Sequence, residues 1–254
     1  MDHLDIAEII SALDPSYWRV RHFDLIDSTQ TSLVTQVVQG NAGPGDVYLA
    51  EFQSAGKGRS NRTFTSKPGD GVLLSTVVAT PSQPESRWGW IPLITGVAAC
   101  NAIFNTTGIN VQLKWPNDLM IDDHKVGGII AEKVKSYVVV GIGINCLQPI
   151  DGLPVPGATS LRLNTEERVN RKALTIELLK SLKSICEQWD EKPLPIENKY
   201  RQLSSTLERA VHVSLPDGTE FTGRAAAISS SGALVLGDGR ELVAADVTHI
   251  RATK

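Results

Sequence analysis

The spacing of apolar residues predicts several helices and strands in the first 200 residues of the chain. Helical spacing is found over residues 5–12, 90–106 and 174–189, and another helix is expected to start with Asp27 as its cap and Gln30 at its third position. Alternating or continuous apolar runs predict strands over residues 19–25, 47–52, 71–78, 110–115, 128–133 and 137–144. Because these elements do not alternate as regular βαβ units, we expect an α+β domain with a mixed β-sheet and flanking helices. A stretch rich in proline and glycine, residues 148–160, is predicted as a loop.

After Tyr200 the pattern changes to short strands separated by turns that contain glycine. The predicted strands cover residues 211–213, 220–225, 233–236 and 241–243. This spacing is typical of a small β-barrel of about five strands. We therefore expect a larger domain over residues 1–205, with residues 1–18 as a short N-terminal extension, and a smaller domain over residues 206–254.

Composition and charge narrow the class of protein. The chain has 254 residues, of which 41% are hydrophobic and 21% are charged, as in ordinary soluble globular proteins. Its net charge of -3 argues against a broad nucleic-acid-binding surface. Without a signal peptide or an apolar run that could span a bilayer, the sequence predicts a cytoplasmic protein with no membrane partner. The three cysteines form no Cys-x-x-Cys pair, which favours reduced thiols, and the five histidines show no metal-binding spacing.

The segment from Glu51 to Phe64 combines three cations with flexible backbone. Lys57, Arg59 and Arg62 lie close to Gly56 and Gly58, between two predicted strands. Lysine and arginine bind phosphate, and glycine lets the main chain approach a ligand closely. The alternative is a solvated, mobile basic loop. A P-loop is excluded, because Glu51 stands in place of its first glycine and Gly58 in place of the serine or threonine that meets magnesium.

A second cluster, Lys114 to Met120, places Asn117 and Asp118 after a strand that ends at Pro116. The two side chains could simply bond their own backbone in a turn. Beside a cationic loop, however, one carboxylate suits a magnesium ion that bridges nucleotide phosphates.

Two further segments carry glycines in apolar strands. Gly127 and Gly128 follow Lys125, and Gly141 and Gly143 precede Asn145. A tight turn with an exposed lysine would explain the first segment equally well. Neighbouring strands interrupted by glycine would make a flat wall for a ligand, and Asn145 could bond a base edge. The second segment is not a dinucleotide fingerprint, because Cys146 stands where its last glycine belongs.

Together, these segments resemble the motifs of biotin protein ligases in order and spacing, over about residues 20–254. The matching segments are Asp27–Gln30, Glu51–Phe64, Lys114–Leu119, Lys125–Ile130 and Gly141–Asn145. The resemblance implies a class II synthetase-like biotin/lipoate ligase catalytic domain followed by an SH3-like domain. It also implies that ATP and biotin, with Mg²⁺, form biotinyl-5′-AMP and pyrophosphate. Biotin would then pass to a lysine of a biotin carboxyl carrier protein of acetyl-CoA carboxylase or a related carboxylase.

The resemblance also assigns roles to residues at the matching positions. It implies biotin binding by Ser28, Thr29, Gln53, Gly56, Lys57, Gly58, Arg59, Lys125, Gly127, Gly128 and Ile142. It implies ATP or adenylate binding by Lys57, Arg59, Arg62, Phe64, Asn117, Lys125 and Asn145, and Mg²⁺ binding by Asp118. Of these, Lys125, Arg59 and Asp118 would be catalytic: Lys125 would meet the biotin carboxylate and the α-phosphate, and Arg59 would help to retain the adenylate.

Three positions depart from the usual family residues. Lys57 stands where arginine is common, which keeps the charge but loses a bidentate fork. Phe64 replaces a common tryptophan, so stacking on adenine should be weaker. Gly127 replaces a common alanine and is expected to loosen a turn.

Two alternatives from other classes share much of this pattern. A lipoate protein ligase or octanoyltransferase would have the same catalytic fold, but Ser28, Thr29 and Gln53 favour a polar ring over an acyl chain. A noncatalytic biotin- or nucleotide-sensing protein could lose Lys125 or Asp118, and both are present. Because the ligase pattern begins within about 20 residues of Met1, too few for a typical domain, we expect a monofunctional enzyme without direct DNA binding.

Overall fold

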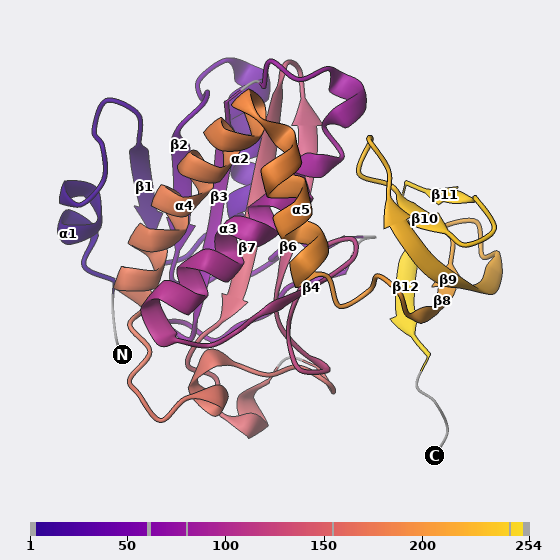
Figure 1. The fold of residues 1–254 in the computed structure, drawn as a ribbon. Coiled ribbons are helices and arrows are strands. Elements are labelled where there is room, and N and C mark those ends of the chain that lie inside the picture. Colours follow the sequence, from indigo (N-terminus) through magenta and orange to yellow (C-terminus); the bar gives the residue numbers. More distant parts are fainter. Residues whose placement is uncertain (1–3, 60–61, 80, 154, 244, 251–254) are drawn as a thin grey trace.

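A mixed β-sheet forms the centre of the larger part of the molecule (Figure 1). The computed structural model describes residues 4–59, 62–79, 81–153, 155–243 and 245–250. The strand order is β1-β2-β3-β7-β6-β5-β4, with β1 and β2 parallel and the other neighbours antiparallel. The strands are β1 (Arg19–Phe23), β2 (Asp46–Ala50), β3 (Gly71–Val78), β4 (Gln112–Lys114), β5 (Asp118–Ile121), β6 (His124–Val134) and β7 (Tyr137–Asn145). The predicted α+β class with a mixed sheet is therefore confirmed.

Helices cover the two faces of this sheet unequally. The helices are α1 (Ile6–Ser11), α2 (Thr29–Gln39), α3 (Trp90–Thr107), α4 (Arg171–Glu191) and α5 (Pro193–Leu203). Three of them, α3, α4 and α5, pack together over one face and enclose the main core, so α3 is buried along most of its length. The opposite face carries α2 over a smaller core cluster around Leu33, Val37 and Val139. Part of that second face is therefore not covered by a helix.

The start of α2 differs from the prediction. The N-cap is Ser28, whose side chain accepts a hydrogen bond from the Thr31 amide, whereas Asp27 was expected in that place. The Asp27 carboxylate instead accepts hydrogen bonds from the Ser28 amide at 2.6 Å and the Ser32 hydroxyl at 3.0 Å. Both residues are good caps, and the extended conformation of Ser28 decides between them.

Several elements of the structure are absent from the sequence prediction. Helix α5 begins at Pro193, a position where proline is tolerated because the first helical turn leaves its amides unpaired. Strand β5 starts at Asp118, inside the segment predicted as a turn, and pairs with β6, which begins at His124 rather than Gly128. The described part of the predicted loop over residues 148–160 contains turns, a single parallel β-bridge from Ala158 to Lys125, and the 3₁₀ segment Ile150–Gly152, while another 3₁₀ segment, Leu161–Asn164, follows it. A further 3₁₀ segment, Glu85–Arg87, precedes α3.

The last part of the chain forms a second, antiparallel sheet with the order β11-β10-β9-β8-β12. Its strands are β8 (Ala210–Ser214), β9 (Glu220–Ile228), β10 (Leu234–Leu236), β11 (Glu241–Leu242) and β12 (Asp246–His249). The first four agree with the predicted strands, β12 is additional, and the sheet fits the expected SH3-like domain. The boundary after residue 205 stays a prediction.

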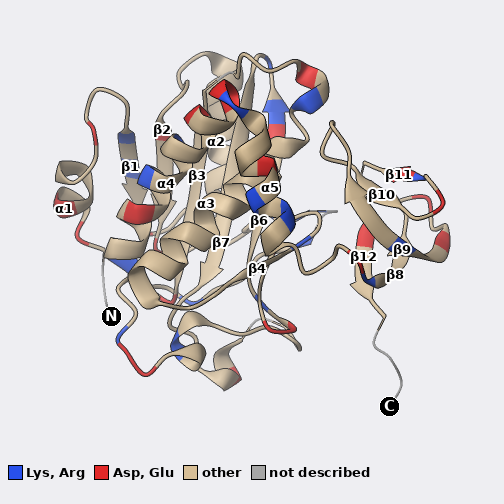
Figure 2. Ribbon diagram, in the orientation of Figure 1, with Lys and Arg blue, Asp and Glu red and all other residues tan. Residues whose placement is uncertain are grey.

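Two indole groups join the small sheet to the larger part. The Nε1 of Trp90 donates to the carbonyl oxygen of Ser229 at 3.1 Å, and that of Trp115 donates to the carbonyl of Gly232 at 3.2 Å. Both rings are buried. Figure 2 shows cationic and anionic residues interspersed over both parts rather than separated by sign. Among the described helices, none is sufficiently long and apolar to span a bilayer.

A buried ion pair closes the base of the predicted cationic loop. The Nη2 of Arg171, in the first turn of α4, lies 2.5 Å from the Oε2 of Glu51. Arg171 also donates from Nε to the Gly71 carbonyl at 2.9 Å, and the Leu4 amide donates to the other Glu51 oxygen at 2.8 Å. Arg171 and Glu51 are only 2% and 3% exposed. One guanidinium thus holds both chain segments between which the loop is suspended.

Replacing Arg171 by methionine should strongly destabilise the protein, because it leaves Glu51 buried without its cation. We expect a loss of about 3–5 kcal/mol in the free energy of unfolding, measured by urea denaturation. The neighbouring Lys172→Met is the control, since its ion pair with Glu8 is solvent-exposed and should contribute about 1 kcal/mol or less. Equal stabilities of the two variants would contradict a structural role for the buried pair.

Candidate active site

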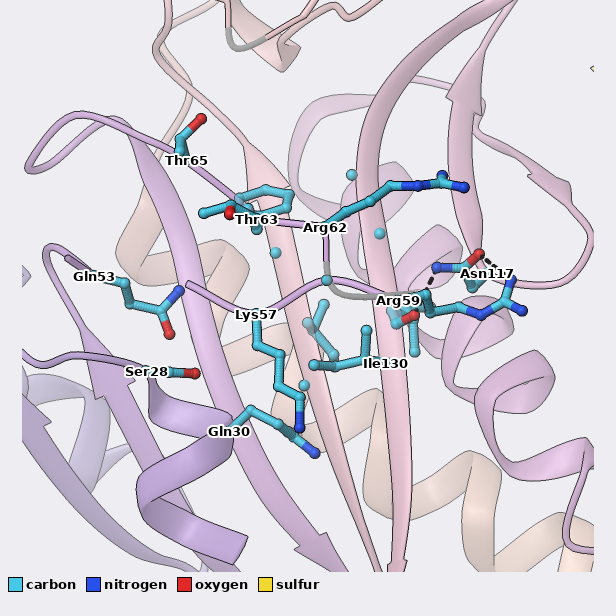
Figure 3. A pocket seen from close by; sticks show the side chains of 18 of the residues that line it. Ser28, Gln30, Gln53, Lys57, Arg59, Arg62, Thr63, Thr65, Asn117 and Ile130 are labelled. Atoms are coloured by element: carbon cyan, nitrogen blue, oxygen red, sulfur yellow. Dashed lines mark hydrogen bonds between the residues drawn. The ribbon is translucent and has the colours of Figure 1, made fainter. Parts of the chain in front are cut away.

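The face of the sheet that carries α2 also contains a cavity of about 320 Å³, beside the first turn of that helix (Figure 3). It lies between the start of α2, strands β3, β6 and β7, and the loop after β2. The site residues proposed from the sequence that line it are Ser28, Thr29, Gln53, Lys57, Gly58, Arg59, Arg62, Phe64, Asn117, Asp118, Lys125, Gly127, Gly128, Ile142 and Asn145. Gly56 does not line it. The separate sequence motifs therefore converge on one space.

Strand alternation explains why the cavity forms at this place. On β7, Val139 contacts the cluster under α2, and the next two positions on the same face are Gly141 and Gly143. A Cβ on Gly141 would lie 2.7 Å from the Gln30 Oε1, and a Cβ on Gly143 would lie 2.7 Å from the ring of Phe64. The missing side chains therefore leave the space that these two residues and a ligand can occupy.

The other predicted wall residues contribute differently. Gly128 pairs with Gly143 in the neighbouring strand and lies beside Lys125, so it belongs to the cavity face. Ile142 has the opposite orientation on β7, and its side chain is part of the main core. Gly127 lies inside β6 rather than in a turn, and a Cβ there would come within 2.5 Å of the Gly143 carbonyl oxygen. This glycine allows two strands to approach closely and does not loosen a turn.

Neutral polar groups surround one end of the cavity. The Gln53 Oε1 accepts hydrogen bonds from the Thr29 amide at 2.8 Å and the Thr29 hydroxyl at 3.0 Å. The Thr29 hydroxyl also lies 2.9 Å from that of Ser75 on β3. Because the Gln53 carbonyl is engaged in this way, its Nε2 is the group that remains for a ligand. Ser28 and Gln53 face the cavity from neighbouring segments (Figure 3).

The cationic loop is folded back on itself like a hairpin. The Gly58 amide donates to the Arg62 carbonyl at 2.7 Å, and the Phe64 amide donates to the Gly56 carbonyl at 2.8 Å. A Cβ on Gly56 would lie 2.3 Å from the Phe64 carbonyl oxygen, so Gly56 supports the loop's shape from outside the cavity. Ser60 and Asn61, which belong to the predicted loop, lie outside the described residues.

Charged groups gather at the other end of the cavity. The Lys125 Nζ lies 2.5 Å from the Asp118 Oδ1. Arg59 donates to the Asn117 Oδ1 at 3.2 Å, and the Asn117 Nδ2 donates to the Ile129 carbonyl at 2.9 Å. Asn117 thus connects the loop to β6, although the amide was predicted to meet a nucleotide.

The two loop arginines have different surroundings. Burial lowers the pKa of the Arg59 guanidinium, while the carboxylates of Asp246 and Asp118 act in the opposite direction. Arginine nevertheless stays cationic in proteins. Arg62 is more exposed and forms an ion pair with Asp246 of β12, so the small sheet contacts the loop directly.

Asn145 is buried at the end of β7, with its amide already engaged by the chain. Its Nδ2 donates to the Thr159 carbonyl at 3.0 Å, and its Oδ1 accepts from Gln148 at 3.3 Å. Each end of the amide retains one further hydrogen-bonding position for a base edge.

The sequence analysis missed Gln30, which lines the cavity, and Glu132, which contacts Gln30 from outside the cavity lining. Gln30, at the start of α2, donates from Nε2 to the Oε1 of Glu132 on β6 at 3.0 Å. The other Glu132 oxygen lies 2.9 Å from the Lys57 Nζ. The sequence could have indicated Glu132, because alternate residues of a strand share one face and Gly128, Ile130 and Glu132 are alternate residues of β6. The partnership with Gln30, which is 102 residues away, has no local signature.

The described residues contain neither a reactive thiolate nor a cluster of metal ligands. Burial raises the pKa of Cys100 and Cys146 to about 12, so both thiols remain protonated at neutral pH. All three cysteines are free. Within the described ranges, no three or more histidine, cysteine, aspartate or glutamate residues gather to hold a metal. Asp118 is a single carboxylate in the cavity, which suits magnesium because that ion retains waters and takes few protein ligands.

Comparisons with known proteins agree with this geometry. The pattern of the biotin/lipoate A/B protein ligase family matches residues 22–148. A biotin--[acetyl-CoA-carboxylase] ligase of Mycobacterium tuberculosis is 32% identical over 88% of this chain and 86% of its own length. The bifunctional ligase/repressor BirA of Escherichia coli is 27% identical over 92% of this chain and 73% of its own length. The structure of a biotin protein ligase from Aquifex aeolicus with biotin and ATP has a TM-score of 0.77 and 26% identity, over 92% of this chain and 99% of its own.

Replacing Gly143 by alanine should weaken ligand binding more than folding. The new methyl group would enter the cavity and displace the Phe64 ring, whose far end is mobile enough to give way. We expect biotin affinity, measured by titration calorimetry, to fall about tenfold or more. Gly43→Ala is the matched control, because a Cβ there meets nothing within 4 Å. Unchanged affinity in Gly143→Ala would show that the ligand does not lie against this wall.

Proposed function

The chain belongs to the biotin/lipoate A/B protein ligase family, and we propose that it is a biotin protein ligase that uses ATP. It would activate biotin as biotinyl-5′-AMP with release of pyrophosphate. It would then transfer the biotinyl group to a lysine of a biotin carboxyl carrier protein of acetyl-CoA carboxylase or a related carboxylase. The similar ligase of M. tuberculosis has acetyl-CoA carboxylase in its name, which supports this class of acceptor.

The observation that carries the proposal is the difference in polarity between the two ends of this cavity. One end has the neutral groups of Ser28, Thr29 and Gln53, and the other has Lys125, Arg59 and Arg62. Biotin has a neutral cyclic urea at one end and a carboxylate at the other, so it would fit along this axis. ATP would then meet the cations with its phosphates.

In the first step, a carboxylate oxygen of biotin would attack the α-phosphorus of ATP. The bond from that phosphorus to the pyrophosphate oxygen breaks, and pyrophosphate leaves with the electron pair. Negative charge collects on the phosphorus oxygens, where the ammonium of Lys125 and the guanidinium of Arg59 would stabilise it. Removing one such donor commonly costs a hundredfold or more in rate, as an order of magnitude.

Asp118 would contribute to the same step through magnesium. A carboxylate beside Lys125 has the oxygen chemistry that this ion prefers, so the residues present fit it. When bound, the ion would neutralise phosphate charge. In its absence Lys125 and Asp118 neutralise each other, which keeps both groups at the reactive end of the cavity.

In the second step, the amine of the carrier lysine would attack the carbonyl carbon of the mixed anhydride. AMP leaves, the amine loses a proton, and an amide forms. Neither step needs a nucleophile from the enzyme, in agreement with the protonated state of Cys100 and Cys146. The protein would act by positioning the reactants and by retaining the adenylate, to which Arg59 of the cationic loop would contribute from the cavity wall.

The deciding experiment is mass spectrometry of a carrier domain incubated with the protein, biotin, ATP and Mg²⁺. We expect one biotinyl group on one lysine. Parallel reactions contain lipoate or octanoate in place of biotin, and modification by either of these alone would make the protein a lipoate ligase or octanoyltransferase. Biotin binding without pyrophosphate release would instead indicate a noncatalytic sensor.

Lys125→Ala should abolish pyrophosphate release while the protein stays folded. Its ammonium lies at the charged end of the cavity, where it would meet the α-phosphate, and its loss should lower the rate about a hundredfold or more. Lys133→Ala on the same strand is the control, because Lys133 pairs with Glu85 on the surface. Circular dichroism would verify folding. Activity of Lys125→Ala within a few-fold of the wild type would contradict the assigned role.

A further inference from the structure

The amide of Gln30 is held in one orientation at the floor of the cavity. Its Nε2 donates to the Glu132 Oε1 at 3.0 Å and to the Val139 carbonyl at 3.1 Å. Both partners are acceptors, so the reversed amide would place its oxygen against two oxygens. The side-chain carbonyl is therefore directed away from these groups.

This carbonyl oxygen is buried and has no hydrogen-bond partner among the described residues. Gln30 is only 2% exposed and lines the cavity. Its Oε1 lies over Gly141, where a Cβ would approach it to 2.7 Å. An unpaired buried acceptor is unfavourable, and a ligand that supplies an N–H or O–H group would remove that penalty.

We propose that Gln30 is a specificity-determining residue whose Oε1 accepts a hydrogen bond from a ring N–H of the substrate. The inference rests on the proposed function, because the cyclic urea of biotin supplies two such N–H groups. Gln53 has the complementary arrangement: its oxygen is engaged by Thr29, and its Nε2 is left to meet the urea oxygen. The two glutamines thus present one acceptor and one donor.

The same arrangement selects against substrates without a ring N–H. The dithiolane of lipoate and the alkyl end of octanoate have no hydrogen to donate, so either would leave the Gln30 oxygen buried and unpaired. Sites built to hydrogen-bond a substrate group reject analogues that lack it far more strongly than apolar pockets do. Gln30 therefore discriminates biotin from lipoate and octanoate, because only biotin relieves the energetic penalty of its unpaired oxygen.

Glu132 acts as a positioning residue for this contact. One carboxylate oxygen fixes the Gln30 amide, and the other lies 2.9 Å from the Nζ of Lys57 in the cationic loop. Because the Val139 carbonyl also accepts from the Gln30 Nε2, loss of the Glu132 carboxylate would loosen this amide without reversing it.

The test compares biotin with its two ureido N-methyl derivatives, one methylated at each ring nitrogen, by calorimetric titration without ATP. The wild type should bind one derivative at least about tenfold more weakly than the other, because only one nitrogen faces Gln30. Gln30→Leu should lose about tenfold or more in biotin affinity, and its preference between the derivatives should fall to within about threefold. Gln30→Met, which keeps the length of the side chain without its acceptor, should lose the same preference.

Gln39→Leu on the exposed end of α2 is the matched control and should keep the wild-type values. If Gln30→Leu does not fold, the same measurements on Gln30→Met decide, because methionine keeps the length of the side chain. Wild-type protein that binds no biotin and releases no pyrophosphate would refute the proposed function itself. A biotin-active wild type that shows no preference between the derivatives, or whose folded Gln30 variants keep full affinity and the same preference, would overturn the role of Gln30 alone.

Discussion

The architecture of the cavity depends on the buried ion pair between Glu51 and Arg171. Both side chains are almost fully removed from water, and the guanidinium also bonds the Gly71 carbonyl. These contacts bring together the two ends of the segment that carries Lys57 to Phe64. A buried pair is expensive unless each group is fully partnered, and here the Leu4 amide bonds the remaining carboxylate oxygen. The two ends of the loop are therefore held together at the edge of the sheet by one guanidinium.

The central sheet divides structural and binding roles between its faces. One face is covered by α3, α4 and α5, and takes Ile142 and neighbouring apolar side chains into the main core. On the other face, α2 covers only part of the strands, and glycines at alternate positions leave the rest free of side chains. Because successive residues of a strand point to opposite faces, one strand can contribute to a tightly packed core and a ligand wall at the same time.

Much of this organisation was predictable from local sequence patterns. The long helices α3 and α4 and the strands β3 and β7 follow from periodicity. The five segments that converge on the cavity follow from residue chemistry and from their resemblance to the motifs of biotin protein ligases. Contacts between distant segments were not predictable in the same way. The pairing of Gln30 with Glu132 depends on the register of β6 and β7 under α2, and the engagement of Asn117 by Arg59 depends on how the loop folds back. The choice of Ser28 over Asp27 as the helix cap likewise depends on the backbone conformation of Ser28.

The contact between the two sheets includes two tryptophans, whose indole N–H groups donate to the turn after β9, and their fluorescence can report on this contact. Trp90 and Trp115 are two of the five tryptophans in the chain, and both are buried at this contact. Neither ring can stay shielded from water if the small sheet separates from the larger part. Intrinsic fluorescence at long excitation wavelengths, where indole absorbs and tyrosine does not, therefore contains a signal for the docking of the two sheets.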